Sequence, residues 1–360
     1  MKKQLQIFFG FLRFSIGSAK EIPDSLKEVD WKEQYAIAKK QCLVGVLFDG
    51  IKRLPADVGM DKGLLFQWMA QNQTLRKANA RLDKAAVEVA EWFGRKGFRT
   101  CVLKGQGNAL LYPPGMERTP GDIDIWVEGG DKRVISFVRS ISPHEKACYH
   151  HIEFPSYKGV EVEVHYRPSF LLCFWHNRKL QKYYERVKEE QFSHRVMLGE
   201  QGEIAIPTVE FNLIFQLTHI YAHLMNEGIG LRQLLDYYYV LISDDLLLIR
   251  DRVQKEFKEL GLWKFAGGIM YIMQEVFGMP ASRLIVPPNE KYGKFVLNEV
   301  LEAGNFGKHD ERNRFGRSKL GHNLQRVYRD IRLVRYFPAE ALCEPLFRIW
   351  HFFWRMKNNK

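Results

Sequence analysis

The chain has 360 residues, of which 46% are hydrophobic and 27% charged, a balance that is ordinary for a globular protein of two or three domains. Its net charge of +12 favours acidic partners such as nucleotides, nucleic acid or a membrane surface. The five cysteines are widely separated and include no Cys-x-x-Cys pair. This spacing argues against a zinc site or redox motif and fits a reducing cytoplasm.

Residues 1–96 have the pattern of a helical N-terminal region. The first residues resemble a signal peptide, but Arg13 interrupts the apolar run and no Ala-x-Ala cleavage site follows. An amphipathic helix that docks on the body is therefore expected, and no apolar run approaches the ~18 residues that a membrane span needs. Asp61 is a plausible N-cap for a long helix over residues 62–96, and Gly97 is its expected stop.

Two short strands with a turn between them follow this helix. Phe98 to Leu103 is an apolar run that predicts a buried strand, and a glycine-containing turn and a short helix over residues 108–112 come next. The second strand carries Asp122 and Asp124, which share one face because side chains two apart on a strand point the same way. We expect both carboxylates to face solvent in a cleft. Two adjacent carboxylates stay ionised together only beside a cation, and oxygen-rich sites suit Mg²⁺ or Mn²⁺.

A later strand repeats this alternation. In residues 160–165 three valines share one face, and Glu161, Glu163 and His165 share the other. This strand would supply a third metal-binding carboxylate; Glu163 is favoured, and Glu161 shares its face and is the alternative. For either glutamate alone, a position on a solvent-exposed strand face without any metal-binding role is the alternative. A helix capped by Asp131 and a short strand at 151–154 complete a small mixed sheet.

These elements predict an α+β fold. The small mixed-sheet core would occupy residues 97–206, between the N-terminal helical region, 1–96, and a helical C-terminal domain, 207–360. A charged helix over residues 178–190 and a hairpin formed by residues 195–198 and 203–206 are expected near the end of the core.

The amino-acid sequences of the central motifs resemble those of a known family. Leu-Lys-Gly, Tyr-Pro, Arg-x-x-Gly-Asp-Ile-Asp and Val-Glu-Val-His, within residues 98–167, resemble largely uncharacterised bacterial nucleotidyltransferases, members of a superfamily that includes DNA polymerase β. The resemblance implies transfer of NMP from an NTP to an acceptor hydroxyl by a two-metal mechanism. The residues that it implies as catalytic and as ligands of Mg²⁺ or Mn²⁺ are Asp122, Asp124 and Glu163.

The same resemblance implies that the glycine-containing turn binds the triphosphate. Lys104, Gly105 and Gln106 would hold the phosphates, because a short turn at a helix N-terminus offers backbone N–H groups to an anion. The superfamily usually has Gly-Ser here, whereas this chain has Gln106, and 17 positions separate Gly105 from Asp122. The departure supports an alternative function, a catalytically degenerate fold that acts as a nucleotide-binding regulatory or antitoxin-like module.

A polar stripe follows one face of the helix expected over residues 208–226. The other faces of this helix are nearly all apolar, so the stripe predicts the wall of a cleft, in which His219 and His223 would contact nucleotide. Hydrogen-bonded core histidines and, with less support, a zinc site are the alternatives. The stripe consists of Asn212, Gln216, His219, His223 and Asn226.

Three further charged residues are candidate nucleotide contacts. Arg118 would bind a phosphate or neutralise the acidic cluster. Arg232 and Asp236 are four residues apart and would pair on one helix, and the resemblance also suggests an Arg-x-x-x-Asp helix beside the active site.

The C-terminal part holds two unusual segments. From Lys308 to Arg335 nine Lys or Arg accompany three acidic residues, which predicts a solvated basic helix or a contact with nucleic acid. Leu346 to Met356 is too apolar and aromatic for a free tail; we expect it to pack on the body, with a dimer or membrane-surface contact as the alternative. No RNA-binding module accompanies the basic segment, so a small-molecule or protein acceptor is favoured over RNA.

Overall fold

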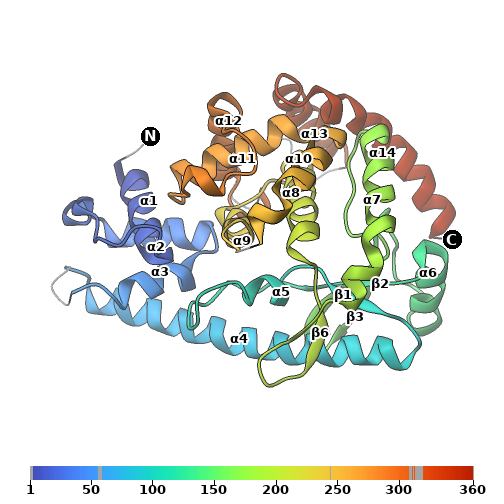
Figure 1. The fold of residues 1–360 in the computed structure, drawn as a ribbon, viewed down its shortest axis with the longest axis horizontal. Coiled ribbons are helices and arrows are strands. Elements are labelled where there is room, and N and C mark those ends of the chain that lie inside the picture. Colours follow the sequence, from blue (N-terminus) through green and yellow to red (C-terminus); the bar gives the residue numbers. More distant parts are fainter. Residues whose placement is uncertain are drawn as a thin grey trace.

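The computed structural model describes residues 3–55, 59–243, 245–307, 310, 312 and 319–359, which form a mainly helical molecule around a small sheet (Figure 1). The N-terminal region is helical, as the sequence predicts. Its elements are α1 (Lys3–Ile16), the 3-10 helix η1 (Asp24–Glu28), α2 (Trp31–Lys40), α3 (Val44–Ile51) and α4 (Lys62–Arg95). The apolar face of α1 is buried, with Phe8 and Leu12 fully inaccessible, so the docked amphipathic helix is confirmed.

Helix α4 connects the N-terminal helices to the sheet. The Asp61 side chain caps it by accepting a hydrogen bond from the Leu64 amide at 3.0 Å, and Gly97 follows its end with φ of +79°. Figure 1 shows α4 beneath the molecule, with α2 and α3 near one end and β1 near the other. Trp68, near the first end, donates to the Val44 carbonyl at 2.8 Å, and Phe93, near the other, belongs to the apolar cluster of the sheet.

The four-stranded sheet is mixed and has the order β1-β2-β4-β3. Its strands are β1 (Thr100–Val102), β2 (Ile123–Val127), β3 (His151–Tyr157) and β4 (Val160–His165). Strands β2 and β4 are parallel, and the outer pairs are antiparallel. Together with the helices, this sheet confirms the α+β class.

Two local predictions differ from the structure. The short helix α5 (Gln106–Ala109) begins earlier than expected, because Gly105 adopts φ of +54° and turns the chain directly into it. Helix α6 (Gly130–Ile141) is capped by Gly129 rather than by Asp131, whose carboxylate pairs with Arg167 at 2.9 Å.

Both faces of the sheet are covered. Valines of β4 and isoleucines of β2 pack with α4 and α6 in one apolar cluster. On the opposite face, the Trp126 ring lies 4.7 Å from that of Phe192 in α7 (Phe174–Ser193) and 5.9 Å from that of Phe211 in α8 (Val209–Asn226). This cover corrects the expectation for Asp124, which is only 3% exposed rather than solvent-facing.

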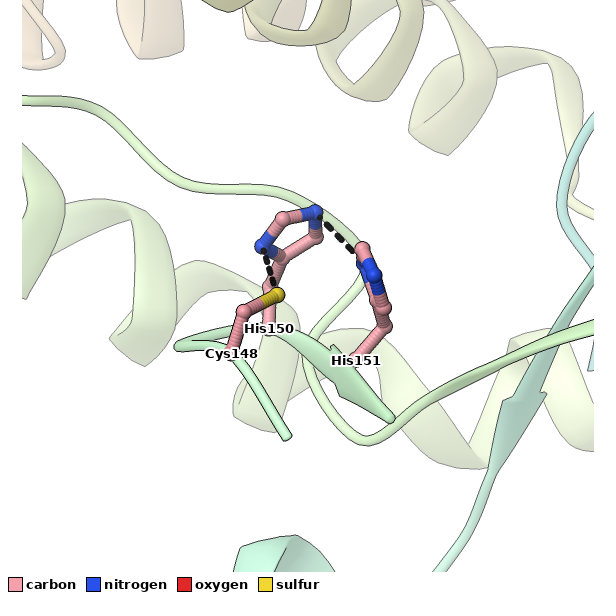
Figure 2. Close-up of side chains that lie close together, drawn as sticks. All are labelled: Cys148, His150 and His151. Atoms are coloured by element: carbon pink, nitrogen blue, oxygen red, sulfur yellow. Dashed lines mark hydrogen bonds between the residues drawn. The ribbon is translucent and has the colours of Figure 1, made fainter. Parts of the chain in front are cut away.

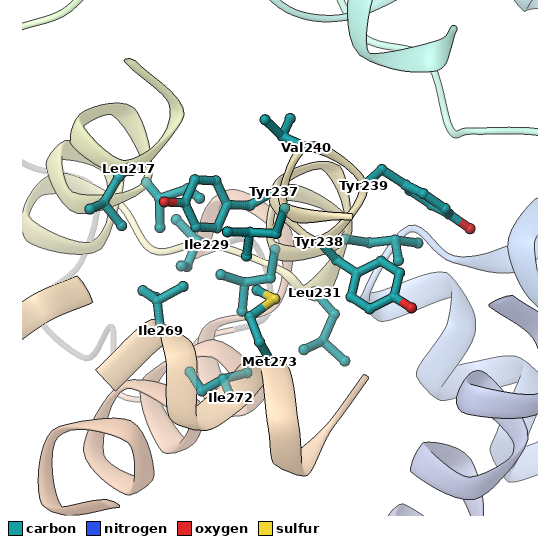
Figure 3. Packing of buried hydrophobic residues seen from close by; sticks show 14 of the residues in the cluster. Leu217, Ile229, Leu231, Tyr237, Tyr238, Tyr239, Val240, Ile269, Ile272 and Met273 are labelled. Atoms are coloured by element: carbon teal, nitrogen blue, oxygen red, sulfur yellow. The ribbon is translucent and has the colours of Figure 1, made fainter. Parts of the chain in front are cut away.

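The C-terminal half is helical after a two-stranded hairpin. Its remaining elements are β5 (Arg195–Met197), β6 (Glu203–Ala205), α9 (Leu231–Leu241), α10 (Leu246–Glu259), α11 (Trp263–Glu275), η2 (Ala281–Arg283), α12 (Glu290–Ala303), η3 (Asn305–Gly307), α13 (Lys319–Val334) and α14 (Pro338–Asn358). Figure 3 shows α8, α9 and α11 packing through Leu217, Tyr237 and Ile269. Their apolar cluster also includes α1, so helices from both ends of the chain share one core.

Two helical glycines provide a test of this packing. A Cβ at Gly45 of α3 would overlap the carbonyl oxygen of Glu117, in the segment that leads to β2. We expect Gly45→Ala to lower the free energy of unfolding by about 1–3 kcal/mol through overpacking. Gly94 is helical and exposed, and a Cβ there would meet nothing within 4 Å. Gly94→Ala should therefore raise the free energy of unfolding by about 0.5–1 kcal/mol. Denaturant unfolding measures both, and equal effects would contradict the tight contact at Gly45.

Candidate functional site

Three carboxylates meet where β2 and β4 run side by side. Asp122 directly precedes β2, and Asp124 lies opposite Glu163 in the parallel register. One oxygen from each of the three lies within 4.8 Å of the others. Glu161 is exposed and does not belong to this group, so the geometry brings Glu163 rather than Glu161 to the aspartate pair.

Asp124 is held as an anion by two neighbours. Its Oδ1 lies 2.9 Å from Lys104 Nζ and 2.9 Å from His165 Nε2. Burial opposes ionisation of Asp124, but Lys104 and His165 outweigh it and hold the pKa of this carboxyl below its ordinary value. Burial would likewise lower the pKa of His165, but its hydrogen bonds to Asp124 and Glu163 raise that pKa to about 9.

Asp122 has the opposite balance. The negative charge of Asp124, and then burial, raise the pKa of Asp122 from 3.8 to about 6. The cluster is therefore short of positive charge, and a divalent cation would supply it. Three carboxylates are hard oxygen donors, so the residues present fit Mg²⁺ or Mn²⁺.

The turn before α5 approaches this cluster from β1. A Cβ at Gly105 would lie 3.4 Å from the Asp122 carbonyl oxygen, and the φ of +54° also favours glycine. Lys104 projects to Asp124 and also lies 3.1 Å from His219 Nε2. The Gln106 side chain instead donates to Asp83 of α4 and lines neither of the two cavities described below.

The polar stripe of α8 has two different parts. Asn212 and Gln216 donate to the Asn108 side chain at 3.2 and 3.0 Å and fasten α8 to α5. His219 and His223 line a cavity, as a cleft wall requires, whereas Asn212 lines neither of the two cavities described below. Burial, and then Lys104, hold the pKa of His219 well below its ordinary value, so this imidazole is neutral. Among the described residues, neither histidine joins a group of three potential metal ligands.

Sequence reasoning missed a chain of side chains beside the carboxylates. Cys148 Sγ lies 3.5 Å from His150 Nδ1, and His150 Nε2 lies 3.0 Å from His151 Nδ1 (Figure 2). His151 Nδ1 in turn lies 3.6 Å from Glu163 Oε2. The histidine pair was visible in the sequence, but only the antiparallel pairing of His151 with His165 brings it to the site.

Arg118 and Asp236 form a buried bidentate ion pair. Arg118 Nε and Nη2 each donate to one Asp236 oxygen at 2.8 Å, and the Tyr112 hydroxyl donates to the same carboxylate at 2.7 Å. The expected pairing of Arg232 with Asp236 is replaced by this contact, because the loop that carries Arg118 packs on α9. Arg232 donates to the Thr119 carbonyl at 2.9 Å.

Two cavities adjoin the carboxylates. The larger, about 460 Å³, is lined by Asp122 and Glu163, by His219 and His223 of α8, and by side chains of α13 and α14 that include Arg326, Arg348 and His351. Its volume suits a small-molecule substrate. The smaller, about 40 Å³, holds Arg118, Arg232 and Asp236. Gly105 and Asp124 also line the smaller cavity, and Lys104, Asp122 and His219 line both. The carboxylates therefore lie between a substrate-sized cavity and a buried ionic network.

Comparisons with known proteins identify a family for this chain. The model of a family described as uncharacterised nucleotidyltransferases matches residues 27–278, which include the carboxylates, α8 and α9. A solved structure of an antigenic nucleotidyltransferase-like protein from Paracoccidioides brasiliensis is similar at 15% identity, over 49% of this chain and 90% of that one, with a TM-score of 0.27. No curated protein matches the chain.

The raised pKa of Asp122 predicts a stability effect. Because the folded-state pKa lies above 3.8, ionisation of Asp122 destabilises the fold as pH rises through about 6. In EDTA at pH 7.5, Asp122→Asn should therefore raise the free energy of unfolding, by up to about 3 kcal/mol. The gain should disappear near pH 4, where the native carboxyl is protonated. Denaturant unfolding at both pH values measures this, and a variant less stable at pH 7.5 would contradict the repulsion.

The Arg118–Asp236 pair predicts a different effect. Asp236→Asn leaves the Arg118 guanidinium buried without a counter-ion and should cost about 3–5 kcal/mol of stability. The double change Arg118→Met and Asp236→Leu removes both charges and should recover most of that loss. Thermal and denaturant unfolding of the three proteins give the comparison. If the double variant is no more stable than the single one, the cost does not come from an uncompensated charge.

Proposed function

Because the chain belongs to the uncharacterised nucleotidyltransferase family, we propose that it transfers NMP from an NTP to an acceptor hydroxyl and releases pyrophosphate. The observation that carries this proposal is the meeting of Asp122, Asp124 and Glu163 beside a substrate-sized cavity. These residues would hold Mg²⁺ or Mn²⁺, which, when bound, stabilises charge on the attacking and leaving oxygens.

The side chains around the carboxylates have separate roles in this proposal. Lys104 pairs with Asp124, and its ammonium group would bind the triphosphate when the carboxylates hold a cation. The acceptor oxygen attacks the α-phosphorus, its proton passes to a carboxylate, and the bond to the β-phosphate breaks. His219, as a neutral imidazole, would orient the substrate, and His165 keeps Asp124 in place.

The other expected nucleotide contacts support the site indirectly. Arg118 and Asp236 satisfy each other, so we propose that they hold α9 and the loop before β2 in register. Arg232 contributes to the same contact through Thr119. Gln106 would act through Asp83 and α4 by fixing the conformation of the turn, and Gly105 would let the turn approach the phosphates.

A small-molecule or protein acceptor is favoured over RNA. Part of the basic segment, residues 308–309, 311 and 313–318, lies outside the described residues. Within the described part, Arg312 pairs with Glu299 and Asp310, each at 2.8 Å, Arg332 lies 3.3 Å from Glu299, and Arg329 is buried. Side chains engaged in this way offer little to an RNA backbone.

A catalytically degenerate, nucleotide-binding module is the second candidate, and the turned-away Gln106 is the observation in its favour. Calorimetry with a non-hydrolysable NTP, with and without Mg²⁺, tests nucleotide binding without requiring the acceptor. Pyrophosphate release in the presence of a cellular small-molecule fraction and, separately, a protein fraction then tests transfer. Metal-dependent binding without any release would favour the module.

Glu163 and Glu161 form a matched pair for the enzyme proposal. They lie on the same strand and face, but only Glu163 reaches the aspartates. We expect Glu163→Gln to lower pyrophosphate release by about 10²-fold or more, since an electrostatic contact to the transition state is lost. Glu161→Gln should stay near the wild-type rate.

Full activity of the double variant Asp122→Asn, Asp124→Asn would rule out the proposed mechanism.

A further inference from the structure

The last two helices carry an unusual share of the exposed apolar surface. Among the described residues, eleven of the twenty-one exposed large apolar side chains lie on α13 and α14. Figure 1 shows both helices at the outer edge of the molecule. On α13 these side chains are Leu324, Val327, Tyr328 and Ile331, and on α14 they are Leu342, Leu346, Ile349, Trp350, Phe352, Phe353 and Met356. A patch of this kind marks an interaction site.

The exposed side chains of α14 follow helical periodicity. Five of them recur at alternating steps of four and three residues, which places them along one side of the helix. We call this side the apolar face of α14; it consists of Leu342, Leu346, Ile349, Phe353 and Met356. The opposite side packs on the body through Phe347 and Glu344, which are 6% and 3% exposed. The expectation that this segment packs on the body is thus met by one side only.

The exposed charges on the described parts of these two helices are all of one sign. Within the described parts of α13 and α14, the three acidic residues are buried, at 9% exposure for Asp330, 2% for Glu340 and 3% for Glu344. The Glu340 carboxylate accepts hydrogen bonds from the Leu172 and Cys173 amides at the start of α7. The exposed basic side chains on α14 are Arg355 and Lys357, and the exposed Arg335 lies just before this helix. The surface is therefore apolar, aromatic and basic.

We propose that the apolar face of α14 docks on an anionic phospholipid surface, with the helix lying in the plane of the interface. Apolar and aromatic side chains would enter the headgroup boundary, while basic side chains contact lipid phosphates. The described residues include no helix long and apolar enough to cross a membrane, which agrees with in-plane binding. A second copy fits less well, because it would bring the same exposed positive charges, and a further net charge of +12, against this face.

Docking would also place the candidate site near the lipid. Arg348 and His351, which line the larger cavity, belong to α14 itself. The cavity would therefore lie about one helix diameter, ~10 Å, from the headgroups. Docking rests on the outer surface alone and does not depend on the proposed transferase activity.

Flotation of the full chain with lipid vesicles tests the proposal without an activity assay. We expect the chain to float with vesicles that contain phosphatidylglycerol, far less with pure phosphatidylcholine, and progressively less as salt rises. The double variant Leu346→Glu, Phe353→Glu should remain with the soluble fraction. Leu247→Glu, Leu248→Glu is the matched control, because these leucines are 63% and 78% exposed on α10, outside the face; this variant should float like the wild type.

A second variant keeps the test decisive if charge in the apolar face impairs folding. Arg355→Gln, Lys357→Gln changes only exposed side chains and should weaken binding to anionic vesicles about fivefold for each charge removed. Absence of flotation with anionic vesicles, or equal flotation of wild type and both variants, would overturn the proposal. So would a dimer, seen by light scattering, that Leu346→Glu dissociates while vesicles leave it unbound.

Discussion

The repulsion among Asp122, Asp124 and Glu163 is the constraint around which this structure is arranged. Two positive groups, Lys104 from the turn after β1 and His165 from the end of β4, hold Asp124 at 2.9 Å each. No such ion pair holds Asp122 within the described part of the chain, and the charge of Asp124, followed by burial, raises the pKa of the Asp122 carboxyl to about 6. The β2–β4 pairing thus stores an electrostatic cost that a bound cation would relieve, which is the usual price of a preorganised ionic site.

The position of this cluster follows from how the two apolar cores meet. One face of the sheet packs on α4 and α6, and the other faces α7 and α8, so the strand that carries Asp124 is enclosed on both sides. A polar group enclosed in this way must find partners within the protein. Asp124 finds them in Lys104 and His165, and the polar stripe of α8 contacts Lys104 in turn through His219.

The sequence predicted an element correctly wherever a single hydrophobic periodicity determined its type and the face on which each side chain lies. Alternation in residues 160–165 placed Glu163 on the face of the aspartates, and a 3.6-residue period with a capping Asp61 predicted α4 within one residue at its end. Contacts between distant segments could not be read in this way. Asp236 pairs with Arg118 rather than with its helical neighbour Arg232, and the cover that buries Asp124 comes from helices formed by residues 174–226.

Lys104 bears on how the proposed phosphate turn is held in a chain that has Gln106 where the superfamily usually has serine. Its ammonium group bridges Asp124 and His219, so a single side chain links the sheet to α8 and borders both cavities. Gln106, two residues after Lys104, connects the same loop to Asp83 of α4 by a side-chain hydrogen bond. The loop is therefore fixed from α4 and α8 at once, and Gly105 supplies the backbone conformation that lets both side chains diverge. In the proposed function, the side-chain anchors make the turn rigid, and Lys104 would supply the charge for the phosphates.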